Sequence, residues 1–200
     1  MPQYFSSIAP KEVKYYPYEA DILGRKFTLY GTSGTFSKEH LDDGTKYLLE
    51  TIFQMDLGTK ILDMGCGTGP IGLILAASDP SRHITMCDVN RRALDLAEEN
   101  AKALGISSQV DIVESDVYLS INSTFSSIVS NPPIRAGKKV TYAIYDGAKA
   151  HLEKDGSLYL VVRRQQGAES VEKHLLSLFN KVEVLRRKKG FWIIKATNKE

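Results

Sequence analysis

The sequence has few of the residues that mark several large classes of protein. It contains only two cysteines, Cys66 and Cys87, and neither has a partner at the spacing of a zinc site. We therefore expect reduced thiols, no disulfide framework and no bound metal. No stretch approaches the roughly 18 apolar residues of a membrane-spanning helix, and the N-terminus lacks an apolar signal segment. The expected location is the cytoplasm, with no membrane partner.

An excess of charge of one sign is also missing. The 26 Lys and Arg nearly balance the 24 Asp and Glu, so the formal net charge is +2, too small by itself to indicate a nucleic-acid partner. The basic residues are unevenly spread, because Arg163, Arg164 and the run 186–189 lie in the last quarter. Such runs fit either a solvated surface or a patch that contacts phosphate, and the sequence favours neither.

Apolar segments of two kinds alternate along most of the chain. Its 200 residues, 42% of them hydrophobic, suit one domain, with an N-terminal extension at 1–57 and a core at 58–200. Strand-like runs lie at 60–64, 84–87, 110–113, 125–130 and 157–162. Helical patterns lie at 70–77, 90–104, 141–152 and 168–179. The alternation predicts an α/β fold in which helices cover both faces of a mostly parallel sheet.

Both ends of the chain depart from this alternation. The last two strands, 182–186 and 191–196, are joined by a segment too short for a parallel crossover. They predict an antiparallel hairpin that completes a sheet of seven strands. In the extension, 20–30 predicts a hairpin around Gly24, followed by a turn at 31–34. Asp42 or Asp43 then caps a helix that carries Tyr47, Leu48 and Ile52.

The first chemical motif is a glycine-rich turn between the first core strand and its helix. An apolar strand ends at Asp63, and Gly65, Gly67 and Gly69 follow at every second position. Glycine is needed where the backbone takes a positive φ or where a ligand passes against the main chain. The helix start that follows offers free N–H groups. By itself the motif also fits a structural tight turn.

Acidic residues follow the next two strands. Asp88 ends the second core strand and can accept hydrogen bonds from ribose hydroxyls, although it could also cap the next helix. Asp116 ends the third strand, where an acid can accept from an adenine amino group. Acids at the carboxyl ends of three successive strands indicate a nucleotide-like ligand, because ligands of open α/β sheets bind at that edge.

The motif Asn131-Pro132-Pro133-Ile134 follows the fourth strand. The prolines cannot continue a sheet ladder and they stiffen the backbone. The Asn131 amide and the Pro132 carbonyl offer acceptors that can hold the hydrogens of a planar amino group and aim its nitrogen lone pair. A proline-rich strand exit is the structural alternative.

These motifs, in this order, resemble class I S-adenosylmethionine-dependent methyltransferases with a Rossmann-like fold. Within that group the chain is similar to the small-domain family of ribosomal RNA guanine-N2 methyltransferases. Asp63 to Gly69 matches the signature Asp-x-Gly-x-Gly-x-Gly, and Asn131 to Pro133 matches Asn-Pro-Pro. The leader Gly34-Thr-Phe36-Ser37, with Leu41 to Gly44 after it, also resembles this family.

The resemblance implies S-adenosylmethionine as the cofactor and ribosomal RNA or the small ribosomal subunit as the partner. It implies catalytic roles for the residues of the proline motif, Asn131, Pro132, Pro133 and Ile134. The implied cofactor-binding residues are Phe36, Asp63, Gly65, Gly67, Gly69, Asp88, Asp116, Val117 and Asn131. Arg135, Lys138 and Lys139 are expected to hold RNA phosphates.

Two departures from the family pattern leave alternatives open. Many exocyclic-amine methyltransferases carry an aromatic residue after Asn-Pro-Pro, whereas this chain has Ile134. Longer members of the family also carry a second, degenerate domain before the catalytic one. Release-factor glutamine and adenine in DNA or RNA remain alternative acceptors. A non-catalytic RNA-binding assembly factor is the alternative from another class, and the oligomeric state is not predicted.

Overall fold

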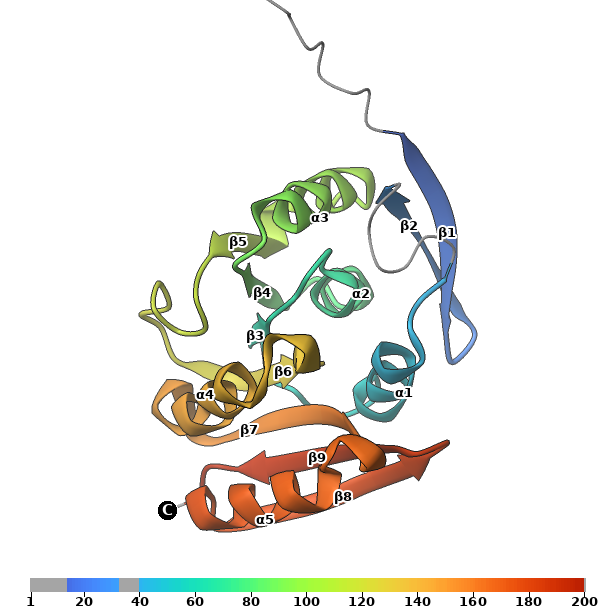
Figure 1. Ribbon diagram of the computed structural model, residues 1–200. Coiled ribbons are helices and arrows are strands. Elements are labelled where there is room, and N and C mark those ends of the chain that lie inside the picture. The colour runs from blue at the N-terminus through green and yellow to red at the C-terminus, as the bar shows by residue number, and fades with distance from the viewer. Residues whose placement is uncertain (1–13, 33–39, 200) are drawn as a thin grey trace, which may run out of the picture.

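The computed structural model describes residues 14–32 and 40–199, which form a seven-stranded sheet with helices on both faces (Figure 1). The strands are β3 (Lys60–Met64), β4 (His83–Asp88), β5 (Val110–Glu114), β6 (Phe125–Ser130), β7 (Leu152–Arg163), β8 (Lys181–Lys188) and β9 (Phe191–Thr197). Their order is β5-β4-β3-β6-β7-β9-β8. The first five are parallel, and β9 is antiparallel to both β7 and β8. The predicted mostly parallel sheet with a terminal antiparallel hairpin is confirmed.

The helices divide between the two faces of the sheet, as the alternation predicts. One face packs against α1 (Asp43–Ile52), α2 (Pro70–Ser78) and α3 (Arg91–Ala103), and the other against α4 (Lys138–Ala148) and α5 (Ala168–Leu178). Successive strand residues point to opposite faces, so that Ile61 enters the first core and Leu62 the second. No helix in residues 14–32 and 40–199 has the length and apolar character that crossing a membrane requires.

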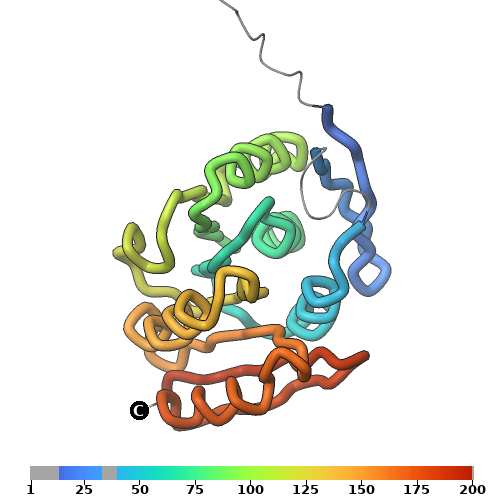
Figure 2. The backbone as a smooth tube through the Cα atoms, in the orientation of Figure 1, coloured from blue at the N-terminus to red at the C-terminus, as the bar shows by residue number. Residues whose placement is uncertain are grey.

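The N-terminal extension adds a two-stranded sheet of its own (Figure 2). Strands β1 (Tyr15–Ile22) and β2 (Arg25–Thr32) pair through a turn at Leu23 and Gly24. The predicted hairpin around Gly24 is therefore confirmed, with strands longer than expected. Its apolar side chains, such as Ile22 and Leu29, are buried in the same core as α1, α2 and α3.

The boundary between α4 and β7 differs from the prediction. The helical pattern expected over 141–152 begins earlier, at Lys138, and ends at Ala148, and Leu152 belongs to β7, where it pairs with Phe125. The first half of this strand has an irregular backbone that interrupts the alternating pattern of its sequence, because Asp155 has a φ of +60°. A Cβ on Gly156 would also lie within 3.1 Å of three carbonyl oxygens. The alternation that marks a strand in the sequence therefore starts only at 157.

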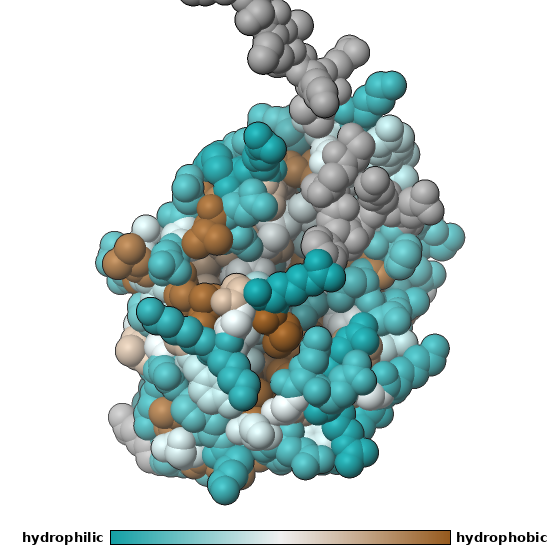
Figure 3. Space-filling model, in the orientation of Figure 1, coloured by the Kyte–Doolittle hydropathy of each residue, from teal (hydrophilic) through white to brown (hydrophobic). Residues whose placement is uncertain are grey.

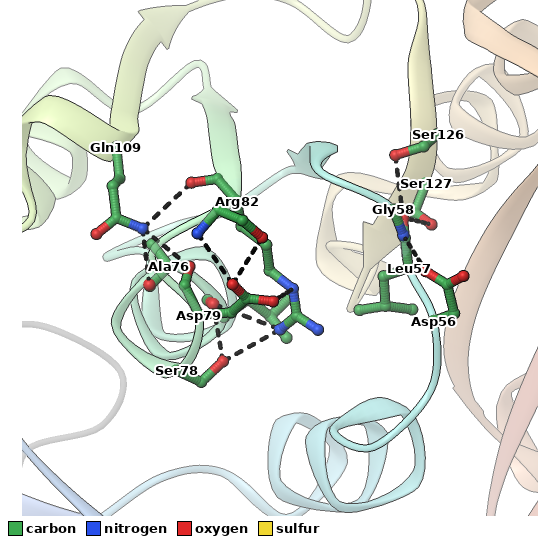
Figure 4. A network of polar contacts seen from close by, with 12 residues as sticks. Asp56, Leu57, Gly58, Ala76, Ser78, Asp79, Arg82, Gln109, Ser126 and Ser127 are labelled. Carbon is green, nitrogen blue, oxygen red and sulfur yellow. Dashed lines mark hydrogen bonds and ion pairs between the residues drawn. The ribbon is translucent and has the colours of Figure 1, made fainter.

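A polar network closes the amino-terminal edge of the sheet, opposite the strand ends that carry the predicted site (Figure 4). The Gln109 amide donates to the carbonyl oxygens of Ala76 at 2.9 Å, Asp79 at 3.0 Å and Arg82 at 3.2 Å. It thereby satisfies carbonyl groups at the end of α2 and in the turn that leads to β4. Ser127 closes the neighbouring connection by donating to the Leu57 carbonyl at 2.7 Å.

Replacing Gln109 with alanine is expected to lower the free energy of unfolding by about 1–3 kcal/mol, because three carbonyl groups lose one shared donor. Urea unfolding followed by circular dichroism measures the change. The matched control is Ser107→Ala in the same exposed turn, which should cost much less. Equal losses in the two variants would contradict the assignment.

Candidate active site

The predicted cofactor residues converge at the carboxyl ends of β3, β4 and β5. Gly65, Asp88, Asp116, Val117 and Pro133 all line one cavity of about 150 Å³. In the same orientation as Figure 1, apolar surface lies in the middle of this face among hydrophilic side chains (Figure 3). A larger cavity, about 640 Å³, lies beside β5, but no predicted site residue lines it. The convergence of glycines and acids, rather than volume, therefore locates the site.

The glycine turn has the backbone that its sequence predicts. Gly65, Gly67 and Gly69 have φ values of +68°, +57° and +82°, which favour residues without a Cβ. Gly69 is the N-cap of α2, and Pro70 occupies the first helical position, where its missing N–H costs nothing. A Cβ on Gly65 would lie 3.4 Å from Pro133 Cδ, so the turn passes directly against the proline motif.

Asp63 is the most deeply buried acid of the site, with 1% of its surface exposed. Its Oδ2 accepts from the Gly72 N–H at 2.8 Å and so satisfies a free donor of α2. Its Oδ1 is buried and has no hydrogen-bond partner among the residues that the structure describes. Burial raises the pKa of this carboxyl from 3.8 to about 7, against a lowering by the Gly72 bond. An orphaned acceptor of this kind fits a cationic ligand group.

Asp88 holds the glycine turn while it faces the cavity. Its Oδ2 accepts from the Gly67 N–H at 2.8 Å, and its Oδ1 accepts from the Asn90 N–H at 2.9 Å. The next helix is capped by Asn90, whose side chain accepts from the Ala93 N–H, as the sequence predicts. Asp88 is therefore less free than we expected, but each carboxylate oxygen retains acceptor capacity for ribose hydroxyls.

The segment after β5 is strained at the cavity wall. Val117 has a φ of +49°, which is a true outlier for a β-branched residue. The Ser115 hydroxyl donates to the Val117 carbonyl at 2.8 Å and accepts from the Ser120 N–H at 3.0 Å, which holds the turn in place. Asp116 is exposed between them and lines the cavity. Such strain persists where the surrounding structure enforces it, most often at ligand sites.

The Asn131 side chain is fixed by residues from the start of α1. Its Nδ2 donates to Asp42 Oδ1 and to Thr45 Oγ1, both at 3.1 Å. Because the Asp42 carboxylate only accepts, the amide nitrogen must face it, and this determines which end of the amide is the oxygen. No group in residues 14–32 or 40–199 donates to Asn131 Oδ1. The amide therefore keeps one acceptor for another molecule.

The proline motif is tied to β3 by a hydrogen bond and continues into a short 3₁₀ helix. The Ser130 hydroxyl, fully buried at the end of β6, donates to the Met64 carbonyl at 2.7 Å and ties the motif to β3. The Pro133 carbonyl accepts from the Ala136 N–H and starts a short 3₁₀ helix, Ile134–Ala136. Ile134 is half-buried, and Pro132 is buried. The motif is thus a rigid loop between the cofactor cavity and α1.

The three basic residues expected to hold phosphate follow this loop. Arg135 is exposed in the 3₁₀ helix, and Lys138 and Lys139 are exposed in the first turn of α4. All three lie within six residues of Pro133, which lines the cofactor cavity. Phe36, the last predicted cofactor residue, lies outside the described residues.

Sequence reasoning missed the residues that position Asn131. It identified Asp42 only as a helix cap, and Asp42 does cap α1 by accepting from the Thr45 N–H at 3.1 Å. The same carboxylate oxygen also receives the Asn131 amide. Gly44 leaves the space for this contact, because its Cβ would lie 3.4 Å from Asn131 Nδ2 and 3.1 Å from Phe191 Cε1. The only signal in the sequence was the leader 41–44, which resembles the family without revealing the contact.

Comparison with known proteins places this site in a family. The methyltransferase small domain family matches residues 26–195, which include every described residue of the site. The chain belongs to the methyltransferase small domain family. Membership confirms the prediction of a methyltransferase.

Individual relatives support this assignment, and they include one chain of similar length and others that are more than twice as long as the matched segment. The uncharacterized protein YbxB of Bacillus subtilis is 45% identical over 177 residues and is matched over 88% of both chains. Ribosomal RNA small subunit methyltransferase C of Aeromonas hydrophila is 38% identical over 148 residues, 72% of this chain but 42% of that protein. The chain thus spans less than half the length of these longer curated relatives.

A solved structure shows the same fold. The 16S rRNA N2 G1207 methyltransferase of T. thermophilus, in complex with AdoMet and guanosine, superposes with a TM-score of 0.82 at 24% sequence identity. The match covers 94% of this chain and 52% of that one. At this identity the likeness establishes the fold, and the acceptor must be argued from the residues of this chain.

Proposed function

We propose that this methyltransferase transfers a methyl group from S-adenosylmethionine to an exocyclic amine of RNA, N2 of a guanine in small-subunit ribosomal RNA. The observation that carries the proposal is the Asn131 amide, whose nitrogen donates to Asp42 and Thr45 and whose oxygen accepts from no described residue. A fixed acceptor beside a cofactor cavity suits an acceptor group that has hydrogens to donate and a lone pair to aim.

The residues of the cavity fit S-adenosylmethionine, whose ammonium and sulfonium groups are cationic. The orphaned Asp63 Oδ1 and the glycine turn would hold the methionine end, and Asp88 would hold the ribose. Asp116 would accept from the adenine amino group, beside the apolar wall that includes Val117. When bound, the cofactor supplies a methyl group activated by a sulfonium leaving group.

The chain's own residues then position the target amine. Asn131 Oδ1 and the Pro132 carbonyl, which no described residue occupies, would accept the two N–H hydrogens of the target amine. Holding both hydrogens fixes the nitrogen and directs its lone pair out of the plane toward the cofactor. Proximity and orientation of this kind can contribute about 7–11 kcal/mol to a reaction. A base within a duplex would first have to leave its stack, which costs a few kcal/mol.

Ribosomal RNA is favoured over the other acceptors by two lines of support. Several relatives, such as those of Aeromonas hydrophila and Vibrio vulnificus, are named ribosomal RNA small subunit methyltransferase C. Ile134 also stands where enzymes acting on glutamine amides or adenine generally carry an aromatic residue, which disfavours stacking of those acceptors.

The test is methyl transfer from labelled S-adenosylmethionine to a panel of acceptors. The panel holds small and large ribosomal subunits, naked ribosomal RNA, tRNA, DNA and release factor, and product nucleosides are identified by mass spectrometry. We expect N2-methylguanine in small-subunit RNA. Label in another acceptor alone would overturn the substrate, and no label despite tight cofactor binding would favour a non-catalytic RNA-binding factor.

Reversing the charge of Lys138 and Lys139 to glutamate is expected to weaken RNA binding at least several-fold, because two exposed cations after the proline motif would become anions. Cofactor affinity should stay unchanged, since neither residue lines the cofactor cavity. Filter binding and calorimetry measure the two affinities. Unchanged RNA affinity would remove both residues from the proposed interface.

A further inference from the structure

The end of β7 lies beside the turn between β8 and β9 at one end of the sheet (Figure 1). A cavity of about 650 Å³ at this place, which we call the hairpin cleft, is lined by three cations and one acid: Arg163, Arg164, Lys189 and Glu169, together with Gln165, Gly167, Ser170 and Gly190. Because β9 runs antiparallel to β7, its first residues lie at the same edge as the carboxyl ends of β6 and β7. The cleft and the proline motif therefore share one edge of the sheet.

The cations of the cleft are only partly neutralised. Glu169 pairs with Arg164 at 3.3 Å, and both are largely exposed, so the pair is weak. Outside the cleft, Glu50 is shared by two cations, Arg186 at 3.0 Å and Lys188 at 3.3 Å. In residues 14–32 and 40–199, the cleft residues Arg163 and Lys189 form no ion pair with a carboxylate. In a chain of formal net charge +2, this is a marked local excess.

One arginine of the cleft is held on an aromatic ring. The Arg163 guanidinium lies 4.6 Å from the ring centroid of Phe191, whose side chain is 8% exposed and packs in the same core as α1. Arg187 stacks on Trp192 at 4.3 Å, but Trp192 belongs to the core on the opposite face of the sheet, so Arg187 lies outside the cleft. A stacked guanidinium keeps its N–H edge available and suits bidentate contact with phosphate oxygens.

The Phe191 ring also joins the cleft to the proposed catalytic amide. Gly44 separates them, because a Cβ there would lie 3.1 Å from Phe191 Cε1 and 3.4 Å from Asn131 Nδ2. Arg163 therefore stacks on the ring that approaches the Asn131 amide across Gly44. A strand whose target base reached Asn131 would carry its neighbouring phosphates across this surface.

We propose that the hairpin cleft binds the phosphodiester backbone of the RNA strand that flanks the target base. The proposal rests on the function proposed above and assigns it a docking surface distinct from Lys138 and Lys139. Arg163 holds the phosphate nearest the target, and Arg164 and Lys189 hold phosphates farther along the strand. The stacked Arg163 favours phosphate over an acidic protein segment, since a flexible peptide needs no fixed planar donor.

The test compares Arg163→Gln/Arg164→Gln/Lys189→Gln with a charge-matched control, Lys60→Gln/Lys173→Gln/Lys181→Gln. The control lysines are exposed; two of them start strands at the opposite edge, and Lys173 lies within α5. Binding of a fluorescent small-subunit RNA transcript is measured across a salt series, with polyglutamate as competitor. Thermal unfolding and cofactor binding show that each variant is folded.

We expect the cleft variant to bind RNA at least tenfold more weakly than the wild type at low salt. The slope of log affinity against log salt should fall by about two, since each single-strand phosphate contact contributes about 0.7. The control should change by less than twofold. Arg163→Lys/Arg164→Lys should recover the salt slope but not the full affinity.

Equal RNA affinity in the cleft variant and the control would overturn this proposal, and so would polyglutamate competing as well as RNA at equal charge. The binding series is independent of turnover. If the wild type methylates no RNA in the acceptor panel, the proposed function fails while the salt slopes still report on the cleft. If it methylates RNA and the cleft variant binds like the control, only the docking surface fails.

Discussion

Replacing Asn131 with alanine is expected to lower turnover on RNA by about 10²-fold or more while the affinity for S-adenosylmethionine stays unchanged. The variant removes the one side-chain acceptor that Asp42 and Thr45 hold in a fixed direction. The target base would still bind, but its amine could rotate away from the line of transfer. Asn131 does not line the cofactor cavity, so cofactor binding should not fall with it.

Single-turnover kinetics and cofactor calorimetry separate these two effects. Thr45→Val and Asp42→Asn are graded controls, because each weakens one of the two bonds to Asn131 Nδ2, and asparagine can still cap α1. They should reduce turnover less than the alanine variant does. Wild-type turnover in Asn131→Ala would contradict the proposed role, whereas retention of a cellular role without turnover would favour an assembly factor.

The second large effect concerns the pH dependence of stability, through Asp63. Its pKa in the folded chain, about 7, lies above the ordinary value of 3.8 because burial disfavours the charged form. Between these two values the folded state binds the proton more tightly than the unfolded state does. Stability is therefore expected to fall as pH rises from about 4 to about 7, by up to about 4 kcal/mol, and then to level off.

Urea unfolding between pH 4.5 and 8 tests this expectation. Asp63→Asn should flatten the curve, because the amide does not ionise and its oxygen can still accept from the Gly72 N–H. The control Asp155→Asn changes an exposed acid at a backbone conformation that asparagine tolerates, and it should keep the wild-type slope. Identical slopes in all three proteins would exclude Asp63 as the source.

The same carboxyl links cofactor binding to protons. A cationic cofactor group beside Asp63 Oδ1 would favour the ionised form, so binding below pH 7 is expected to release a proton and affinity to rise toward pH 7. Calorimetry in buffers of different ionisation enthalpy counts the protons. Absence of proton release at pH 6 would place the cofactor's charge elsewhere.

Local patterns in the sequence were enough to predict the sheet and the cofactor side of the site. Strand ends at Asp63, Asp88 and Asp116, together with the glycine turn, meet where parallel strands must bring them. The start of β7 was missed because the irregularity at Asp155 and Gly156 interrupts its periodicity. A strand segment without alternating apolar residues cannot be predicted from local periodicity.

The acceptor side depends on contacts that sequence spacing does not encode. Asn131 meets Asp42 and Thr45 across almost half the chain, and Phe191 reaches Gly44 from near the other end. The basic run 186–189 could be read as a solvated surface or as a phosphate patch until its partners were known. The Trp192 ring and the shared Glu50 distinguish its members, which the sequence alone presents as equivalent.

The wide separation of these contacts has a consequence for how a newly made chain matures. Strands β3, β4 and β5 and their helices follow one another closely, so the loop-closure entropy of joining them is small. Helix α1 instead completes its packing only when β9 is present, because Tyr47 packs edge-on against Phe191 with ring centroids 5.6 Å apart. During synthesis the half that carries the predicted cofactor residues can fold early, whereas the half that carries the predicted acceptor residues closes only after the last strand is made. We expect a nascent chain to acquire its two binding halves in that order.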